Sequence, residues 1–155
     1  MKWIECLADL IFPRKCEICG RLLTGDERYI CEDCMEDMPL TYYWDWPENP
    51  AEKKLWVRTH LHRVIPLFFY TRESRYITLI HKIKYQGKAH LGHYMGFMLG
   101  EKLRGVLSDV DYVVPIPLHP IRRWRRGYNQ AEIIAGGVID ALFGKDKAKR
   151  HLRCD

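Results

Sequence analysis

Four cysteines near the start of the chain have the residue type and spacing of a metal site. They follow the pattern C-x2-C-x11-C-x2-C and are Cys16, Cys19, Cys31 and Cys34. Two residues between thiols form a tight turn that directs both sulfurs to one point, and a hairpin then brings the second pair opposite the first. We therefore predict a structural zinc site of four thiolates, with Gly20 and residues 24–27 ("TGDE") supplying the turns.

Two other interpretations use the same cysteines. A rubredoxin-like iron site takes the same ligand set, and a pair of redox C-x-x-C motifs has the same local pattern. The redox interpretation requires a C-x-x-C at the start of a helix in a βαβ context, which the sequence does not predict here. Four thiolates leave no open coordination position, so the metal is expected to support folding and not catalysis. Cys6 lies outside the pattern and is expected in the core.

A second chemical feature is a run of arginines in residues 115–132, "PIPLHPIRRWRRGYNQAE". It follows an apolar segment that is predicted to be a strand and precedes a predicted helix, so we place the arginines in a loop at that edge of an α/β sheet. Ligands bind at such edges, where helix amides and bidentate arginines hold anions. The alternative is a solvated bend without function. The residues expected to bind phosphate or nucleic acid are Arg122, Arg123, Arg125, Arg126, Gly127, Tyr128, Asn129 and Gln130.

The elements that would position this loop follow from apolar periodicity and capping signals. They are a strand over 64–70, a helix after Ser74 that ends before Gly87, a helix over 91–103, a strand over 111–119 and a helix from Asn129 to Gly144. Asn129 and Glu132 have the spacing of a capping box. Strands alternating with helices predict an α/β fold.

The chain is expected to have three parts: an N-terminal helix and zinc ribbon over 1–40, a linker over 41–60 and an α/β domain over 61–155. The helix is predicted over 1–13, where Pro13 ends it. Several aromatic residues of the linker could form a base-stacking platform, but we expect them to hold the linker against its neighbour.

Charge divides the chain in a similar way. Residues 1–50 have 5 Lys+Arg and 11 Asp+Glu, a net charge of −6, whereas residues 51–155 have 20 and 9, a net charge of +11. This asymmetry favours two modules, the second facing an anionic partner. No signal peptide and no apolar run of membrane-spanning length is found in the sequence, so we expect no membrane insertion and a cytoplasmic location.

Three segments together resemble one known family. "LADLIFPRKCEICG…CEDC", "LIHKIKYQGKAHLG" and "VVPIPLHPIRRWRRGYNQAEIIA" cover nearly the whole chain and are similar to the ComF family. The resemblance implies an N-terminal zinc ribbon joined to a type I phosphoribosyltransferase-like domain, and a role in natural competence and uptake of single-stranded DNA. Competence helicase or recombination proteins are implied as partners. By position, Lys84 and Tyr85 of "KYQG" are implied to line the phosphate or substrate side of the cleft, together with residues Arg126 to Gln130.

The sequence departs from that family in one respect. Type I phosphoribosyltransferases carry a D-D-x-x-T-T-G-like loop that binds phosphoribosyl pyrophosphate (PRPP) with Mg²⁺, and these 155 residues contain neither an Asp-Asp nor a Thr-Thr pair. We therefore expect a chain truncated before the PRPP motif, an incomplete transferase-like domain that is inactive alone, and Mg²⁺ with PRPP only in an intact protein. Two alternatives remain, a zinc-ribbon nucleic-acid-binding module and a protein-interaction module without enzymatic activity. The acceptor base and the oligomeric state do not follow from the sequence.

Overall fold

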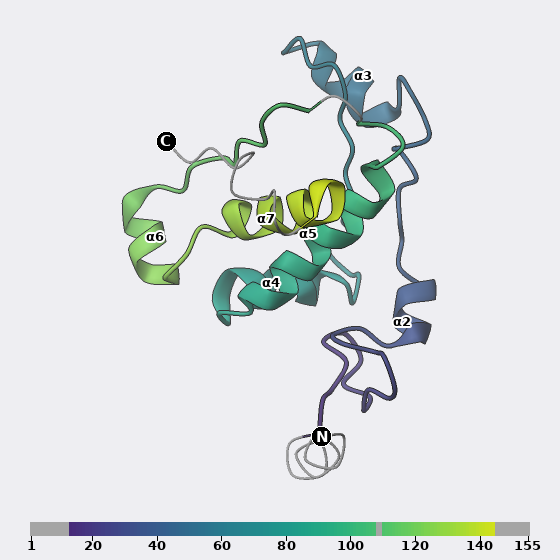
Figure 1. Cartoon of the computed structure of the whole chain (residues 1–155), viewed down its shortest axis with the longest axis vertical. Helices are drawn as coiled ribbons and strands as arrows, with labels where there is room; N and C mark the ends of the chain where they lie inside the picture. Colours follow the sequence, from purple (N-terminus) through teal and green to yellow (C-terminus); the bar gives the residue numbers. More distant parts are fainter. Residues whose placement is uncertain (1–12, 108–109, 145–155) are drawn as a thin grey trace. The chain divides into compact units, whose positions relative to one another are not determined.

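The computed structural model describes residues 13–107 and 110–144 (Figure 1). Contacts divide the chain into two units. Of the described residues, 13–39 with 70–80 form the ribbon unit, and 40–69 with 81–107 and 110–144 form the helical unit. The helix predicted over 1–13 falls almost wholly outside the described residues. Cys6, Cys154 and the lysine- and arginine-rich residues 145–153 also lie outside them. Among the described helices, none is long and apolar enough to cross a lipid bilayer.

The ribbon unit brings together two segments that are distant in sequence. The first contains the cysteine pairs and the short helix α2 (Glu32–Glu36), and the second is residues 70–80. The buried Tyr76 hydroxyl donates a hydrogen bond to the Cys34 carbonyl at 3.1 Å. Arg75 forms an ion pair with Asp37 at 2.6 Å. These contacts attach the second segment directly behind one of the metal-ligand positions.

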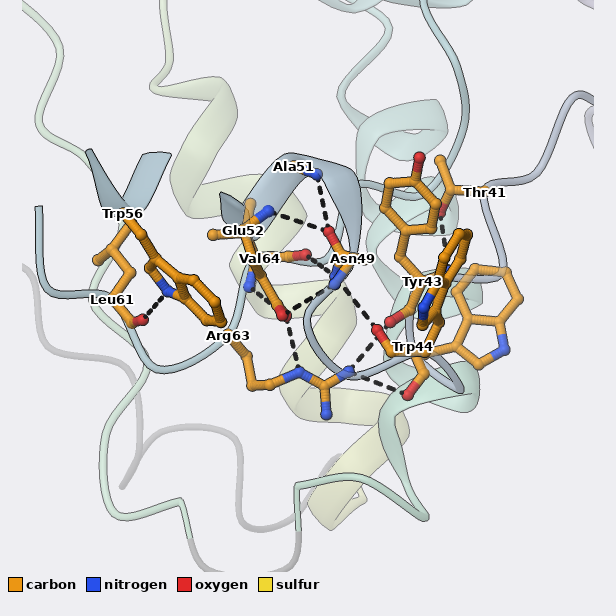
Figure 2. Close-up of polar contacts among 11 residues, drawn as sticks. Thr41, Tyr43, Trp44, Asn49, Ala51, Glu52, Trp56, Leu61, Arg63 and Val64 are labelled. Atoms are coloured by element: carbon orange, nitrogen blue, oxygen red, sulfur yellow. Dashed lines mark hydrogen bonds and ion pairs between the residues drawn. The ribbon is translucent and has the colours of Figure 1, made fainter. Parts of the chain in front are cut away.

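The helical unit begins with a loop held by buried polar contacts (Figure 2). Asn49 caps α3 (Pro50–Trp56): its side chain accepts hydrogen bonds from the Ala51 and Glu52 N–H groups, and the Glu52 carboxylate accepts one from the Asn49 N–H. This is a complete capping box, with proline at the first helical position. The helix α3 thus forms within the segment that was expected to be a linker.

Glu52 also closes the loop at its far end. Its Oε1 accepts from the Arg63 guanidinium at 2.9 Å and from the Val64 N–H at 3.2 Å, while Arg63 donates further to the Tyr43 and Trp44 carbonyls. Burial alone would raise the pKa of the Glu52 carboxyl, but the Val64 N–H and the Arg63 guanidinium more than offset this effect and hold the pKa below its usual range. The buried carboxylate is therefore ionised and fully paired.

Three longer helices follow, near the positions predicted from the sequence. They are α4 (Ile77–Tyr85), α5 (Ala89–Leu103) and α7 (Gln130–Phe143). Asn129 caps α7 as expected, accepting from the Ala131 N–H. The predicted capping box is wrong in one detail, because the Glu132 carboxylate accepts from the Asn129 side-chain amide and not from its backbone N–H. Gly144 ends the helix as predicted.

The helices α5 and α7 pack against each other (Figure 1). Glycines form the contact between them. A Cβ atom added at Gly96 would lie 2.0 Å from the Ile134 carbonyl oxygen, and one added at Gly137 would lie 2.0 Å from the His93 carbonyl oxygen. Because real Cβ atoms do not approach backbone so closely, the two helix backbones are in direct contact here. Beside this contact, Trp44, Leu103 and Val138 form a buried apolar cluster.

The predicted strands over 64–70 and 111–119 are not formed, and the α/β expectation is corrected accordingly. Within the described residues, β-structure is limited to isolated bridges, such as Leu40 with Phe68, and the rest of the regular structure is helical. In the second segment, Pro115 and Pro117 have no N–H to donate to a ladder. Val114 and Ile116 are 69% and 80% exposed, so this apolar segment is not a buried strand.

The glycine contact predicts opposite effects for two neighbouring substitutions in α7. Gly137→Ala should destabilise the protein by about 1–3 kcal/mol, because the added methyl group overlaps the α5 backbone. Gly136→Ala is the matched control: its Cβ would meet only the His93 ring, at 3.8 Å, so the better helix propensity of alanine should leave stability unchanged or raised by up to about 1 kcal/mol. Urea unfolding measures both, and equal effects would contradict the contact.

The buried Glu52 predicts a pH-dependent stability difference. Because its folded-state pKa lies below that of an unfolded glutamate, about 4.3, the ionised carboxylate stabilises the fold above that pH, and this contribution is lost as the pH falls through the folded-state value. Glu52→Gln should therefore lower the melting temperature by several degrees at neutral pH and by less at about pH 3. Comparing variant and wild type at each pH cancels acid effects on the rest of the chain.

Glu48→Gln is the control for this measurement, because Glu48 is exposed in the same loop. Its melting temperature should follow that of the wild type across the pH range. A Glu52→Gln deficit that stays constant with pH would show that Glu52 acts through packing and not through its charge.

Candidate functional site

The four cysteines of the predicted metal site converge in the ribbon unit. Their Sγ atoms all lie within 4.8 Å of one another, and the Cys19 and Cys31 sulfurs are 3.6 Å apart. Cys16, Cys31 and Cys34 are buried, while Cys19 faces solvent. Sulfurs bound to one zinc at about 2.3 Å in a tetrahedron lie a little under 4 Å apart, so the described geometry fits that ion.

Tight turns place each cysteine pair. After the first pair, the Gly20 N–H donates to the Cys16 carbonyl with Gly20 at φ +76°, a left-handed conformation that favours glycine. An antiparallel bridge between Lys15 and Leu22 continues the hairpin. The second pair lies at the start of α2, where Cys31 is the N-cap residue. The turn predicted over 24–27 is confirmed by a hydrogen bond from the Glu27 N–H to the Thr24 carbonyl.

Backbone amides point at the sulfur of Cys16. Its Sγ accepts from the Ile18 N–H at 3.5 Å and the Cys31 N–H at 3.4 Å. Burial acts to raise the pKa of this thiol, but the surrounding backbone N–H groups, Cys19 included, outweigh it and bring the pKa to about 6. Burial raises the pKa of Cys34. Amides aimed at a sulfur stabilise the thiolate form, which is the form that binds zinc.

A charged residue that the sequence did not single out joins the two pairs. The Glu27 carboxylate accepts from the Thr24 N–H and the Glu32 N–H, each at 2.7 Å, and so connects the hairpin turn to the start of α2. These bonds, that of Thr24 first, hold the pKa of Glu27 below its usual range. Arg21 bridges Glu27 and Asp33 across the same gap. The sequence does contain a signal for this role: Glu27 is an acidic residue at the end of a turn, and it comes shortly before the N-terminus of a helix, where negative charge is favourable.

The comparisons with known proteins agree with this geometry. Residues 7–43 match a double zinc ribbon domain. The match spans 37 of the 155 residues, and within it the chain offers four cysteines and no histidine, which is one tetrahedral set of ligands. It confirms the zinc ribbon predicted from the cysteine spacing. Curated proteins and solved structures give no match.

The second predicted site, the arginine run, forms a helix and not a loop. Helix α6 (Pro120–Arg126) contains all four arginines. Pro120 occupies the first helical position, arginine is a good helix former, and Gly127 ends the helix at φ +78°. The prediction of a loop was wrong because the run is short and follows three closely spaced prolines, although Pro120 is also a signal for the start of a helix.

A pocket of about 540 Å³ opens beside α6 in the helical unit. It is lined by Lys84, Tyr85, Gly87, Arg122, Arg125 and Arg126. Three arginines therefore share one side of α6, as the spacing i, i+3, i+4 places them. Four of the six lining residues are cationic, and no carboxylate is among them. The structure thus brings Lys84 and Tyr85 of "KYQG" together with the arginines.

The other predicted residues of this segment hold the pocket walls in place. The Tyr128 hydroxyl donates to the Ile83 carbonyl in α4, and Gln130 accepts from Arg126 at 2.9 Å. Asn129 is buried and donates to the Ile116 carbonyl at 3.1 Å. Arg123 lies outside the pocket lining and faces Glu132 at 3.8 Å. These residues support the site and do not line it.

Two features of this region were not expected from the sequence. Gly87 lines the pocket after α4 and adopts φ +67°, a left-handed conformation that favours glycine. Trp124 is 87% exposed on α6, and Tyr85 is 71% exposed. The Trp124 ring thus lies almost wholly in solvent between Arg123 and Arg125.

Substitution of a cysteine tests the metal site. Cys31→Ser should reduce bound zinc from about one ion per chain to none and unfold the ribbon unit, because a structural zinc site with three thiolates loses most of its binding free energy. Zinc content after dialysis and amide hydrogen exchange over residues 13–39 measure both effects. Cys154→Ser is the control, since Cys154 lies outside the C-x2-C-x11-C-x2-C pattern in the sequence. Retained stoichiometric zinc in Cys31→Ser would contradict the assignment.

Proposed function

We propose that this chain binds single-stranded nucleic acid through α6 and the adjoining pocket. The observation that carries the proposal is the cationic lining: Arg122, Arg125, Arg126 and Lys84 converge on one cavity with no acidic residue among the lining residues. Among the described residues, no carboxylate pairs with Arg122, Arg125 or Lys84. Phosphate groups neutralise such a cluster, and arginine binds them with two parallel hydrogen bonds.

Exposed aromatic rings favour a single strand over a duplex. Trp124 projects from α6 between the arginines, and Tyr85 lies at the pocket. Unpaired bases stack on such rings with little sequence preference, while a basic groove follows the backbone. One exposed ring thus lies among four arginines of α6, and basic residues combined with exposed rings are what single-strand binding uses.

The resemblance to the ComF family gives this proposal a biological setting. It implies a role in natural competence, with the chain acting in the cytoplasm on incoming single-stranded DNA beside helicase or recombination proteins. The zinc ribbon then serves as a folded support, and its matched domain type is compatible with a nucleic-acid-binding or protein-interaction module. A transferase activity has no supporting residues here, because the chain contains no D-D-x-x-T-T-G-like loop.

A phosphorylated ribose is a second candidate ligand, favoured by one observation. The cationic residues enclose a cavity of about 540 Å³, a volume typical of small-molecule sites. A strand passing over a flat basic surface does not need such a cavity. The two candidates share phosphate recognition and differ in whether the ligand extends beyond the pocket.

Loss of the pocket arginines should weaken strand binding in a salt-dependent way. Binding of a fluorescent oligothymidine, followed by anisotropy, should weaken as salt rises, with a slope of about 0.7 per neutralised phosphate. The double variant Arg122→Ala/Arg125→Ala should raise Kd at least tenfold at low salt and reduce this slope by about 1–2. Both effects follow from the loss of two phosphate contacts.

Lys53→Ala/Lys54→Ala is the matched control, because it removes the same charge from an exposed stretch of α3. It should change Kd less than twofold by the weak, screened effect of distant charges. Equal losses in both double variants would show that net charge alone attracts the strand. No detectable binding by the wild type would overturn the proposal and favour the interaction-module alternative.

A further inference from the structure

The cationic pocket contains more positive charge than an internal phosphodiester can balance. Four cationic side chains line it, and an internal phosphodiester carries one negative charge and exposes two free oxygens. A terminal phosphomonoester carries about −1.5 to −2 at pH 7 and exposes three acceptor oxygens. Three arginine forks therefore find a fuller set of acceptors on a phosphorylated end than on the middle of a strand.

The arrangement of the arginines shows that this charge is directed into the cavity. Arg123, the one arginine of α6 outside the lining, faces the carboxylate of Glu132. On one side of α6 the positive charge is thus partly neutralised by a carboxylate, and on the other side the positive charge is concentrated. Only the concentrated side, with Arg122 and Arg125, faces the cavity.

The pocket is also held open by contacts that do not involve a ligand. The Arg126 guanidinium lies 5.5 Å from the centre of the Tyr85 ring and bonds to Gln130, and Tyr128 bonds to the backbone of α4. These contacts fix α6 relative to the end of α4, where Lys84 and Tyr85 lie. Preorganised walls lower the cost of binding a small, highly charged group.

We propose that this pocket binds the phosphorylated terminal nucleotide of a single strand, with its phosphomonoester among Lys84 and the three arginines and its sugar or base beside Tyr85. The extension of the ligand beyond the pocket rests on the proposed function; the recognition of a phosphomonoester does not. The shared chemistry, a phosphate monoester on ribose or deoxyribose, also occurs in free nucleotides, so the experiment has to separate the two sources.

The test compares oligonucleotides of one sequence that differ only at their ends. Wild-type protein should bind the 5′-phosphorylated or the 3′-phosphorylated form at least tenfold more tightly than the form with two hydroxyl ends. Lys84→Ala should bring this ratio close to one, whereas Lys53→Ala/Lys54→Ala should keep it. Lowering the pH through about 6 should also reduce the ratio, because the terminal phosphate then loses its second charge.

Each outcome distinguishes the inference from the proposed function. Equal affinity for phosphorylated and hydroxyl ends would overturn the terminal-phosphate site and leave strand binding intact. Thermal stabilisation by a nucleoside monophosphate or ribose 5-phosphate without any oligonucleotide binding would support the phosphomonoester pocket and overturn strand binding. A preference for a phosphorylated end that Lys84→Ala does not change would place recognition elsewhere and overturn the assignment to this pocket.

Discussion

The direct backbone contact between α5 and α7 is the constraint on which the helical unit depends. Gly92, Gly96 and Gly100 recur every fourth residue along one side of α5. A Cβ at Gly92 would be 3.3 Å from Ile83 of α4 and 3.4 Å from Ile133 of α7, so three helices meet at this position. Because α4 carries Lys84 and the chain enters α7 directly after α6, this small-residue stripe sets the separation of both pocket walls.

The ribbon unit depends on a different source of stability. It contains about fifty residues, and below roughly that size a hydrophobic core alone is marginal, so small domains add a metal or disulfides. Here the four cysteine thiolates provide the metal site. The Ile18 and Cys31 N–H groups donate to the Cys16 sulfur and so stabilise its thiolate form. The Tyr76 hydroxyl bonds to the Cys34 carbonyl, so a segment about forty residues away in sequence is attached directly to a cysteine of the metal site. A closed site of four thiolates has no open coordination position, so it serves stability and not catalysis.

The sequence was most informative where residue type determines local geometry. The cysteine spacing, the turns at Gly20 and residues 24–27, the Asn129 cap and the three longer helices all follow from short-range rules. Helix α3 had an equally local signal in "NPAE", an N-cap, a first-turn proline and a capping glutamate, but the surrounding aromatics and prolines suggested a linker. The Glu52 contact with Arg63 joins residues eleven apart through a loop, and no periodicity indicates it.

The two predicted strands do not form for a physical reason that also explains why α6 is a helix. An apolar run becomes a strand only if a partner accepts its hydrogen bonds, and sequence patterns do not show the partner. Around residues 111–119 the prolines remove donors, the described residues offer no neighbouring strand, and Ile116 remains 80% exposed. The chain instead turns at Pro120 into a helix whose last turn carries Arg123, Arg125 and Arg126.

This choice of helix over loop determines what the arginines can bind. At a helix C-terminus the carbonyl dipoles carry partial negative charge, which offsets part of the repulsion between neighbouring guanidinium groups without any ligand. An extended loop would alternate consecutive side chains between opposite sides, whereas the helix gathers Arg122, Arg125 and Arg126 on one side and leaves Trp124 exposed. Helical spacing therefore gathers a run of like charges on one side of α6, with an exposed aromatic ring beside it.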